Sequence, residues 1–220
     1  MKTKLITLFF SLLFLLSSSI VALADSVYVG ESVYLTKINV VNPSVDTSGG
    51  PFAVIDYNSY QYLSTSFCIE LNEYLAYPMV VLSISDFAVM GGVGGGNPDP
   101  LDLKTAYLYY QYRSGVALDA NALQVAFWLI EQETDAVGTG LLDQEKAYLA
   151  LAQKYITLAE EAVADGWTNT NNQEVKVMNL VLVDGTPVQS QLILIPEPTT
   201  LLLLGLGLFG LVGIARKLKQ

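Results

Sequence analysis

Two patterns of apolar and polar residues divide the chain between its ends. Residues 26–41 and 50–71 are rich in Val, Ile, Tyr, Phe and Thr, and the first of these stretches alternates as a half-buried antiparallel strand does. The same character returns at 174–185 and 188–195, where an Asp-Gly pair predicts the turn between two strands. Strands are therefore expected towards both ends of the central region.

Three stretches between these strands have the apolar spacing of helices: 101–115, 120–134 and 144–166. Glycines follow the first and the third, as expected at helix C-termini. The residues expected to begin the three helices are Asp99 or Pro100, Asp119 and Asp143, in that order. The predicted fold class is α+β, an antiparallel β core with a helical insert.

A glycine-rich segment precedes the first predicted helix. Residues 91–98 read GGVGGGNP, but the Lys-Ser/Thr of a phosphate-binding loop is missing and acidic residues follow, so a flexible connector is predicted. Asn97, Asp99 and Asp102 lack the regular alternation of a calcium-binding loop. Helix capping accounts for the aspartates, and no metal site is expected.

The first 24 residues have the layout of a secretory signal peptide. Lysines near the start precede an apolar run from Leu5 to Leu16, and Ala22 and Ala24 occupy the positions of a cleavage site before Asp25. A membrane anchor would need a longer apolar span. We therefore expect export through the Sec translocon and a globular domain over residues 25–195.

The last 25 residues form a second targeting segment. A Pro196-Glu197-Pro198 triplet precedes the apolar stretch 201–215, which has about the minimum length of a transmembrane helix. Basic residues beginning with Arg216 and Lys217 follow, and they would hold that end in the cytoplasm. The preceding domain would then lie outside the inner membrane.

Residues 196–220 resemble the PEP-CTERM sorting signal in all three parts: the triplet, the short apolar helix and the basic cluster. The resemblance implies processing by an exosortase near the triplet, with transient attachment to the inner membrane. It also implies a Gram-negative bacterium that makes extracellular polysaccharide, and placement at the cell surface or in the extracellular matrix.

The composition restricts the chemistry of the central domain. The whole chain has a net charge of −10, so nucleic acids and anionic lipid surfaces would repel it. One cysteine and no histidine exclude an internal disulfide, Ser-His and Cys-His catalysis and most zinc sites. No cofactor is expected.

The single cysteine, Cys68, lies in the segment SFCIEL, near the end of the last predicted N-terminal strand. A lone cysteine is most often a small buried hydrophobic residue. A catalytic thiolate is disfavoured because Glu70 and Glu73 are acidic neighbours. A third interpretation needs neither a histidine nor a resting thiolate: the thiol condenses with a glutamine side chain, expels ammonia and forms an internal thioester.

Two segments are similar to motifs of the bacterial surface thioester domains. Phe67-Cys68-Ile69 resembles their aromatic-Cys-apolar motif, and LQVAFW at 123–128 resembles their Thr-Gln-x-Ala-Ile/Val-Trp motif, with Leu123 in place of threonine. The resemblance implies a thioester-domain-like fold over most of 26–195. It makes Gln124 an orienting hydrogen-bond donor, whereas a polar residue capping a buried helix is the alternative.

The same resemblance implies that the bonding glutamine lies late in the chain, in the segment VQSQLIL. Gln189 and Gln191 are both candidates. Phe127 and Trp128 would shield the bond, although a role for both in the core is compatible with the sequence.

Paired carboxylates leave a secreted carbohydrate-active enzyme to be considered. Glu131, Glu133 and Asp135 cluster at the end of a predicted helix, and Glu70 and Glu73 follow a strand. In so acidic a chain such clusters are interpreted as solvated faces, and no enzyme is predicted.

The leading hypothesis is an exosortase-sorted surface or matrix protein that forms a Cys-Gln thioester. It would attach covalently, once per molecule, to amines of a surface protein or to hydroxyls of extracellular polysaccharide. The alternative is a noncovalent scaffold protein of the polysaccharide matrix, in which Cys68 is only structural.

Overall fold

The structure is a computed structural model that describes residues 27–38, 49–170 and 174–195. The predicted signal peptide (1–24) and the whole predicted sorting segment (196–220), with its apolar stretch 201–215, lie outside these residues. Within the described part of the chain, no helix has the length and apolar character needed to cross a membrane.

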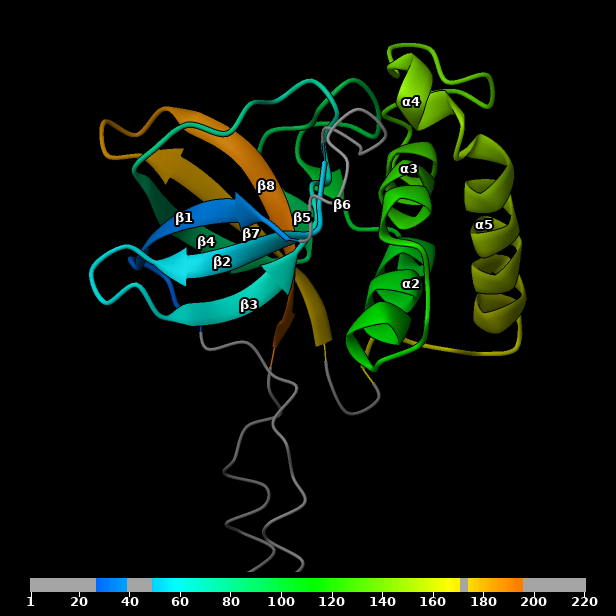
Figure 1. Cartoon of the computed structure of the whole chain (residues 1–220). Coiled ribbons are helices and arrows are strands. Elements are labelled where there is room, and N and C mark those ends of the chain that lie inside the picture. The colour runs from blue at the N-terminus through cyan, green and yellow to red at the C-terminus, as the bar shows by residue number, and fades with distance from the viewer. Residues whose placement is uncertain (1–26, 39–48, 171–173, 196–220) are drawn as a thin grey trace, which may run out of the picture.

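Six antiparallel strands form the main sheet, in the order β3-β2-β1-β4-β7-β8 (Figure 1). Their bounds are β1 Ser32–Lys37, β2 Phe52–Asp56, β3 Tyr62–Ser66, β4 Met79–Ser85, β7 Glu174–Leu182 and β8 Pro187–Ile195. A second sheet pairs β5 Phe87–Ala88 with β6 Asp99–Pro100. The strands together with the helices agree with the predicted α+β class.

The two edges of the main sheet meet. Immediately after β3, the carbonyl of Phe67 accepts a hydrogen bond of 3.0 Å from Leu192 N of β8, and Ile69 N donates to Ser190 O at 3.3 Å. These bonds close the curled sheet around one of two apolar clusters. That cluster includes Val33, Leu35, Val54, Met79, Val81, Leu180 and Ile193, together with Cys68.

Helices cover one side of the curled sheet (Figure 1). They are α2 Leu103–Arg113, α3 Ala120–Ile130, the single turn α4 Asp143–Lys146 and α5 Leu149–Ala164. A second apolar cluster joins α2, α3 and α5 to Val177 of β7 and Leu192 of β8. β7 and β8 thus have apolar residues in both clusters, which explains their nearly continuous burial.

The helix starts differ in part from the prediction. Asp119 caps α3 as expected, because its side chain accepts a hydrogen bond from Ala122 N. Asp99 and Pro100 do not begin α2; they form β6, and Asp102 is the cap. Asp143 is not a cap either: it is the first residue of the short α4, and the long helix α5 begins only at Leu149.

The strands also differ from the prediction. The stretch 50–71 contains two strands, β2 and β3, because a turn that places Tyr60 at φ 59° separates them. β4 was not predicted, although it lies between β1 and β7 in the sheet. Cys68 lies just beyond β3 rather than within it.

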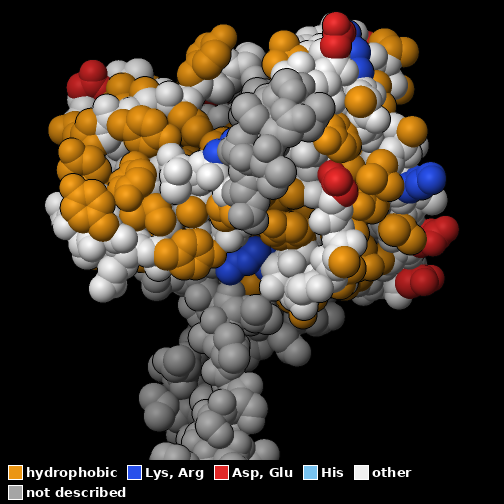
Figure 2. Space-filling model, viewed as in Figure 1, with side chains coloured by type: hydrophobic (Ala, Val, Ile, Leu, Met, Phe, Trp, Pro, Cys, Tyr) orange, Lys and Arg blue, Asp and Glu red, His pale blue; other side chains and the backbone are white. Residues whose placement is uncertain are grey.

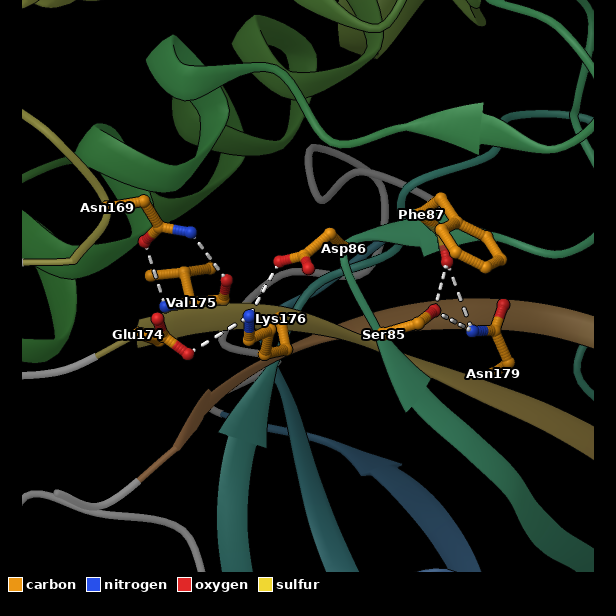
Figure 3. A network of polar contacts seen from close by, with 8 residues as sticks. All are labelled: Ser85, Asp86, Phe87, Asn169, Glu174, Val175, Lys176 and Asn179. Atoms are coloured by element: carbon orange, nitrogen blue, oxygen red, sulfur yellow. Dashed lines mark hydrogen bonds and ion pairs between the residues drawn. The ribbon is translucent and has the colours of Figure 1, made fainter. Parts of the chain in front are cut away.

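Polar contacts hold the start of β7 against its neighbours (Figure 3). The Asn169 side chain accepts from Val175 N at 2.9 Å and donates to Val175 O at 2.8 Å. Lys176 Nζ lies 2.6 Å from Asp86 Oδ1 and 3.0 Å from Glu174 Oε2. These contacts fix where the segment after α5 enters the sheet, although exposed ion pairs contribute little stability.

Candidate functional site: a buried cysteine and glutamine

Cys68 and Gln191 face each other across the closure of the sheet. Cys68 forms an isolated antiparallel bridge with Gln191 of β8, and the Gln191 side-chain nitrogen Nε2 lies 3.4 Å from Cys68 Sγ. Their exposed fractions are 1% and 0%. The thiol and the amide therefore touch in a space closed to solvent.

Ser66 fixes the orientation of the Gln191 amide. Its hydroxyl, fully buried in β3, donates a hydrogen bond of 3.0 Å to Gln191 Oε1. The amide oxygen is therefore held by a serine while the amide nitrogen points at the sulfur. This serine was not singled out in the sequence, because only the sheet closure brings it to Gln191.

The second candidate, Gln189, makes a different contact. Its side-chain nitrogen donates to the backbone carbonyl of Glu70, two residues beyond Cys68. Because the two segments are antiparallel, pairing Cys68 with Gln191 sets residue 70 opposite residue 189. Of the two glutamines, it is Gln191 that the structure brings to the sulfur.

Gln124 holds the backbone of the cysteine. Its Oε1 accepts from Cys68 N at 3.2 Å and from Gly50 N at 2.7 Å, and its Nε2 donates to Cys68 O at 2.9 Å. The residue is fully buried in the middle of α3, so the alternative of a helix cap is wrong. It is a hydrogen-bond donor beside the cysteine, directed at the main chain.

A pair of glycines packs over this arrangement. A Cβ added at Gly49 would overlap the side-chain carbons of Gln124, and one at Gly50 would lie 2.9 Å from a ring carbon of Phe67. Any larger residue would push the segment off the Gln124 side chain.

Aromatic rings surround the residues that flank Cys68. The Phe67 ring makes edge contacts with Tyr109, Tyr112 and Phe127, at centroid distances of 6.3, 5.1 and 5.4 Å. The Trp128 ring nitrogen donates to the Glu70 carbonyl at 3.2 Å. Phe127 and Trp128 thus enclose the segment on either side of the cysteine and belong to the core as well.

Burial keeps the thiol protonated. It raises the pKa of Cys68 to about 12; the Gln191 hydrogen bond opposes this effect, and the charge of Glu70 adds to it. The cysteine is therefore a neutral thiol at pH 7. A resting catalytic thiolate does not fit this site.

Three of the acidic residues that were interpreted as solvated are buried, and this prediction is wrong. Glu70, Glu131 and Glu133 are at most 3% exposed. Burial, followed by the charge of Glu73, raises the pKa of Glu70 to about 8, and burial raises that of Glu131 to about 8. Ser190 N donates to Glu70 at 3.0 Å, which offsets part of the cost of burial.

Glu133 anchors the predicted connector at 91–98, which is a loop in the structure. Its carboxylate accepts from Leu71 N at 2.8 Å, Val93 N at 3.0 Å and Gly94 N at 3.1 Å. The backbone N–H groups of the glycine-rich loop therefore donate to a carboxyl group of its own domain rather than to a phosphate. Asp135, at the end of the acidic cluster, is exposed and accepts hydrogen bonds from Val137 N and Thr139 N.

The two aspartates considered for calcium have other roles. Asp102 caps α2, and Asp99 is buried in β6, where burial and the Glu133 charge raise its pKa to about 6. In the part of the chain that the structure describes, no group of three or more Cys, Asp or Glu side chains could hold a metal ion.

Comparison with known proteins identifies the C-terminal segment. Residues 194–217 match the PEP-CTERM protein-sorting motif, and the match includes Pro196, Glu197, Pro198, Arg216 and Lys217. No curated protein and no solved structure matches the chain, so the resemblance to thioester domains has no support from these comparisons. The chain thus carries the sorting motif that exosortases process, which marks it as an exported protein that is sorted at the membrane and placed outside the cell.

Proposed function

We propose that Cys68 and Gln191 form an internal thioester, through which this exported protein attaches covalently to a primary amine of an extracellular partner. The observation that carries the proposal is the 3.4 Å contact between Cys68 Sγ and Gln191 Nε2 inside a closed core. A thiol and a carboxamide held in contact have the high effective concentration that such a condensation needs.

The bond would form without any external reagent. Sγ adds to the side-chain carbonyl carbon of Gln191, the bond from that carbon to Nε2 breaks, and the thiol proton leaves with the nitrogen as ammonia. Because the proton passes from sulfur to the leaving nitrogen, no resting thiolate and no histidine are required. The closed core would protect the thioester from hydrolysis until binding of a partner exposes the bond.

An amine suits this site better than a hydroxyl. An amine attacks as the neutral base, forms an amide with the Gln191 acyl group, and gives its proton to the departing sulfur, whose pKa is high in this environment. A hydroxyl would need a base to take its proton, and the buried neighbour Glu70 is itself protonated below about pH 8. Each molecule reacts once, so it is no turnover enzyme.

The test is the intact mass of the purified full chain beside that of the Cys68→Ala variant. The wild type should be lighter by one ammonia than the mass calculated from its sequence, whereas Cys68→Ala should have its calculated mass. Methylamine should convert the wild type to the amine adduct, in which the Cys68 thiol is free to be alkylated. Gln191→Ala should abolish the reaction, whereas the matched Gln189→Ala variant should retain it. A full mass that methylamine leaves unchanged would refute the thioester.

A noncovalent scaffold is the second candidate, and exposed tyrosines favour it. Tyr57, Tyr60 and Tyr62 of the β2–β3 hairpin are 46%, 74% and 57% exposed, and Figure 2 shows hydrophobic side chains across the side formed by β1–β3. Exposed aromatic rings often mark a binding surface. Loss of retention on matrix polysaccharide in Tyr60→Ala and Tyr62→Ala, in a chain of full mass, would support this role.

A further inference from the structure

We propose that Ser66 is a catalytic residue of this site, because its hydroxyl donates a hydrogen bond to the carbonyl oxygen at which negative charge develops when the thioester forms and when it is attacked. This inference rests on the proposed thioester and adds a residue to it.

The position of Ser66 follows from the sheet. Ser64 and Ser66 alternate inward on β3, opposite Val54 and Phe52 of β2, and both are fully buried. A hydroxyl in such an apolar space needs a partner. Ser66 finds it in Gln191 Oε1 at 3.0 Å, whereas Ser64 donates to the carbonyl of Thr65.

The chemistry places the charge at this oxygen. When Cys68 Sγ bonds to the carbonyl carbon of Gln191, an electron pair moves onto Oε1, and it returns when the bond to Nε2 breaks. When an amine later attacks, the same oxygen takes up charge again before the bond to sulfur breaks. A hydroxyl already directed at Oε1 needs no reorganisation to stabilise that charge.

The arrangement of donors makes Ser66 the group suited to this role. The other amide of the site, that of Gln124, is directed at the main chain of Cys68 and Gly50. Glu70 directs one carboxyl oxygen to Ser190 N, and the other has no hydrogen-bond partner among the described residues. Of the contacts described here, the Ser66 hydroxyl is the one that donates to the reacting carbonyl oxygen.

A structural role and a catalytic role give different results. If Ser66 only satisfies a buried amide, its loss lowers the free energy of unfolding but leaves the reaction rate of the folded thioester unchanged. If it polarises the carbonyl, its loss slows the reaction of protein that is still folded. Ser64 is a matched control, because it has the same side chain, strand and burial but does not contact Gln191.

The experiment measures the rate at which methylamine releases the Cys68 thiol in the purified full chain. Ser66→Ala should slow this release by about 100-fold, the scale of losing one donor to a developing oxyanion. Ser64→Ala should react at the wild-type rate, and Ser66→Thr, which keeps the hydroxyl, should recover most of the rate. An unchanged rate in folded Ser66→Ala that carries the thioester would overturn the inference and leave the proposed function intact.

A measurement on the wild type covers the case in which Ser66→Ala does not fold. A donated hydrogen bond weakens the carbonyl bond, so the thioester stretching band, taken as the infrared difference before and after methylamine, should lie below that of a simple thioester in an apolar solvent. A band at the apolar-solvent frequency would overturn the role of Ser66. A wild-type chain of full mass would overturn the proposed function, and this inference with it.

Discussion

Gln189 and Gln191 show what a sequence can and cannot say about single residues. Their side chains lie two positions apart on one strand, so both point to the same side and both fit a cysteine partner. The register between β8 and the segment after β3 decides between them, and a slip of two residues would exchange them. That register is set by distant pairings, which no local pattern records.

Gln124 is expected to be the polar residue of this site that contributes most to stability. Gln124→Leu would leave Cys68 N and Cys68 O without their side-chain partner in a closed core and would remove the bond from Gly50 N, at a cost of about 2–5 kcal/mol in the free energy of unfolding. Urea unfolding measures this loss. Gln153→Leu, on the exposed face of α5, is the control and should change stability little.

Glu70 should make stability depend on pH. Its pKa rises from 4.5 in the unfolded chain to about 8 in the fold, so its contribution is fully present below pH 4.5 and is lost as the pH rises through 8. Glu131 acts in the same direction. Between pH 5 and pH 8, the free energy of unfolding should fall less in Glu70→Gln than in the wild type, by on the order of 1–3 kcal/mol. Urea unfolding at the two pH values measures this difference.

A matched variant checks this cause. Glu160→Gln makes the same change at an exposed position of α5 and should leave the pH dependence of stability as in the wild type. A Glu70→Gln variant whose stability falls with pH as steeply as the wild type would contradict the prediction.

Among the elements, the helices and terminal strands followed from local pattern, and β4 did not. The sequence predicted helices near their observed positions because apolar spacing and turn residues are local signals. β4 has seven residues and directly follows Pro78, and no strand was predicted there. The caps were less predictable, since Asp99, Asp102, Asp119 and Asp143 are all suitable residues and only the backbone geometry selects among them.

The true and false caps can be separated by mutation. Asp119→Ala removes the side chain that accepts from Ala122 N and should cost about 1 kcal/mol in thermal or urea unfolding. Asp143→Ala changes an exposed aspartate at the start of α4, so it should stay within about 0.5 kcal/mol of the wild type. Equal losses in the two variants would contradict the assignment of the caps.

The glycine-rich loop should loosen when Glu133 is removed. Glu133→Ala deletes the acceptor for Leu71 N, Val93 N and Gly94 N, so amide hydrogen exchange should speed up at these three positions. Asp135→Ala is the matched control, since Asp135 accepts within its own turn and should affect only residues 137–139. Unchanged protection at Val93 in Glu133→Ala would show that other contacts hold the loop.

At the scale of the whole molecule, the order of the predicted elements indicated the class of the fold but not its topology. Strands at both ends of the domain and helices between them indicate α+β. The placement of β4 between β1 and β7, and the meeting of β3 with β8, rest on contacts between residues far apart in sequence. The burial of Glu70, Glu131 and Glu133 was missed for the same reason, because backbone donors from other segments stabilise each carboxyl in the core.

The net charge of −10 should favour cationic partners in the proposed reaction. At low salt, a peptide with several lysines should label the protein faster than a net-neutral peptide that contains one lysine. The advantage should disappear at high salt, because screening removes attraction between exposed charges. Labelling kinetics at two ionic strengths test this, and equal rates for both peptides at low salt would contradict it.

The position of Gln191, in the last described strand and close to the sorting motif, has a mechanical consequence. In the proposed reaction the acyl group stays on Gln191, so the partner becomes bonded to a residue only four positions before Ile195, where the described chain ends and the sorting motif has begun. Tension between the partner and a tethered C-terminal end would run through these few residues of backbone. Apart from this last part of β8, the curled sheet and the helices would lie outside the path of the force, and the attachment would hold even if pulling unfolded the domain.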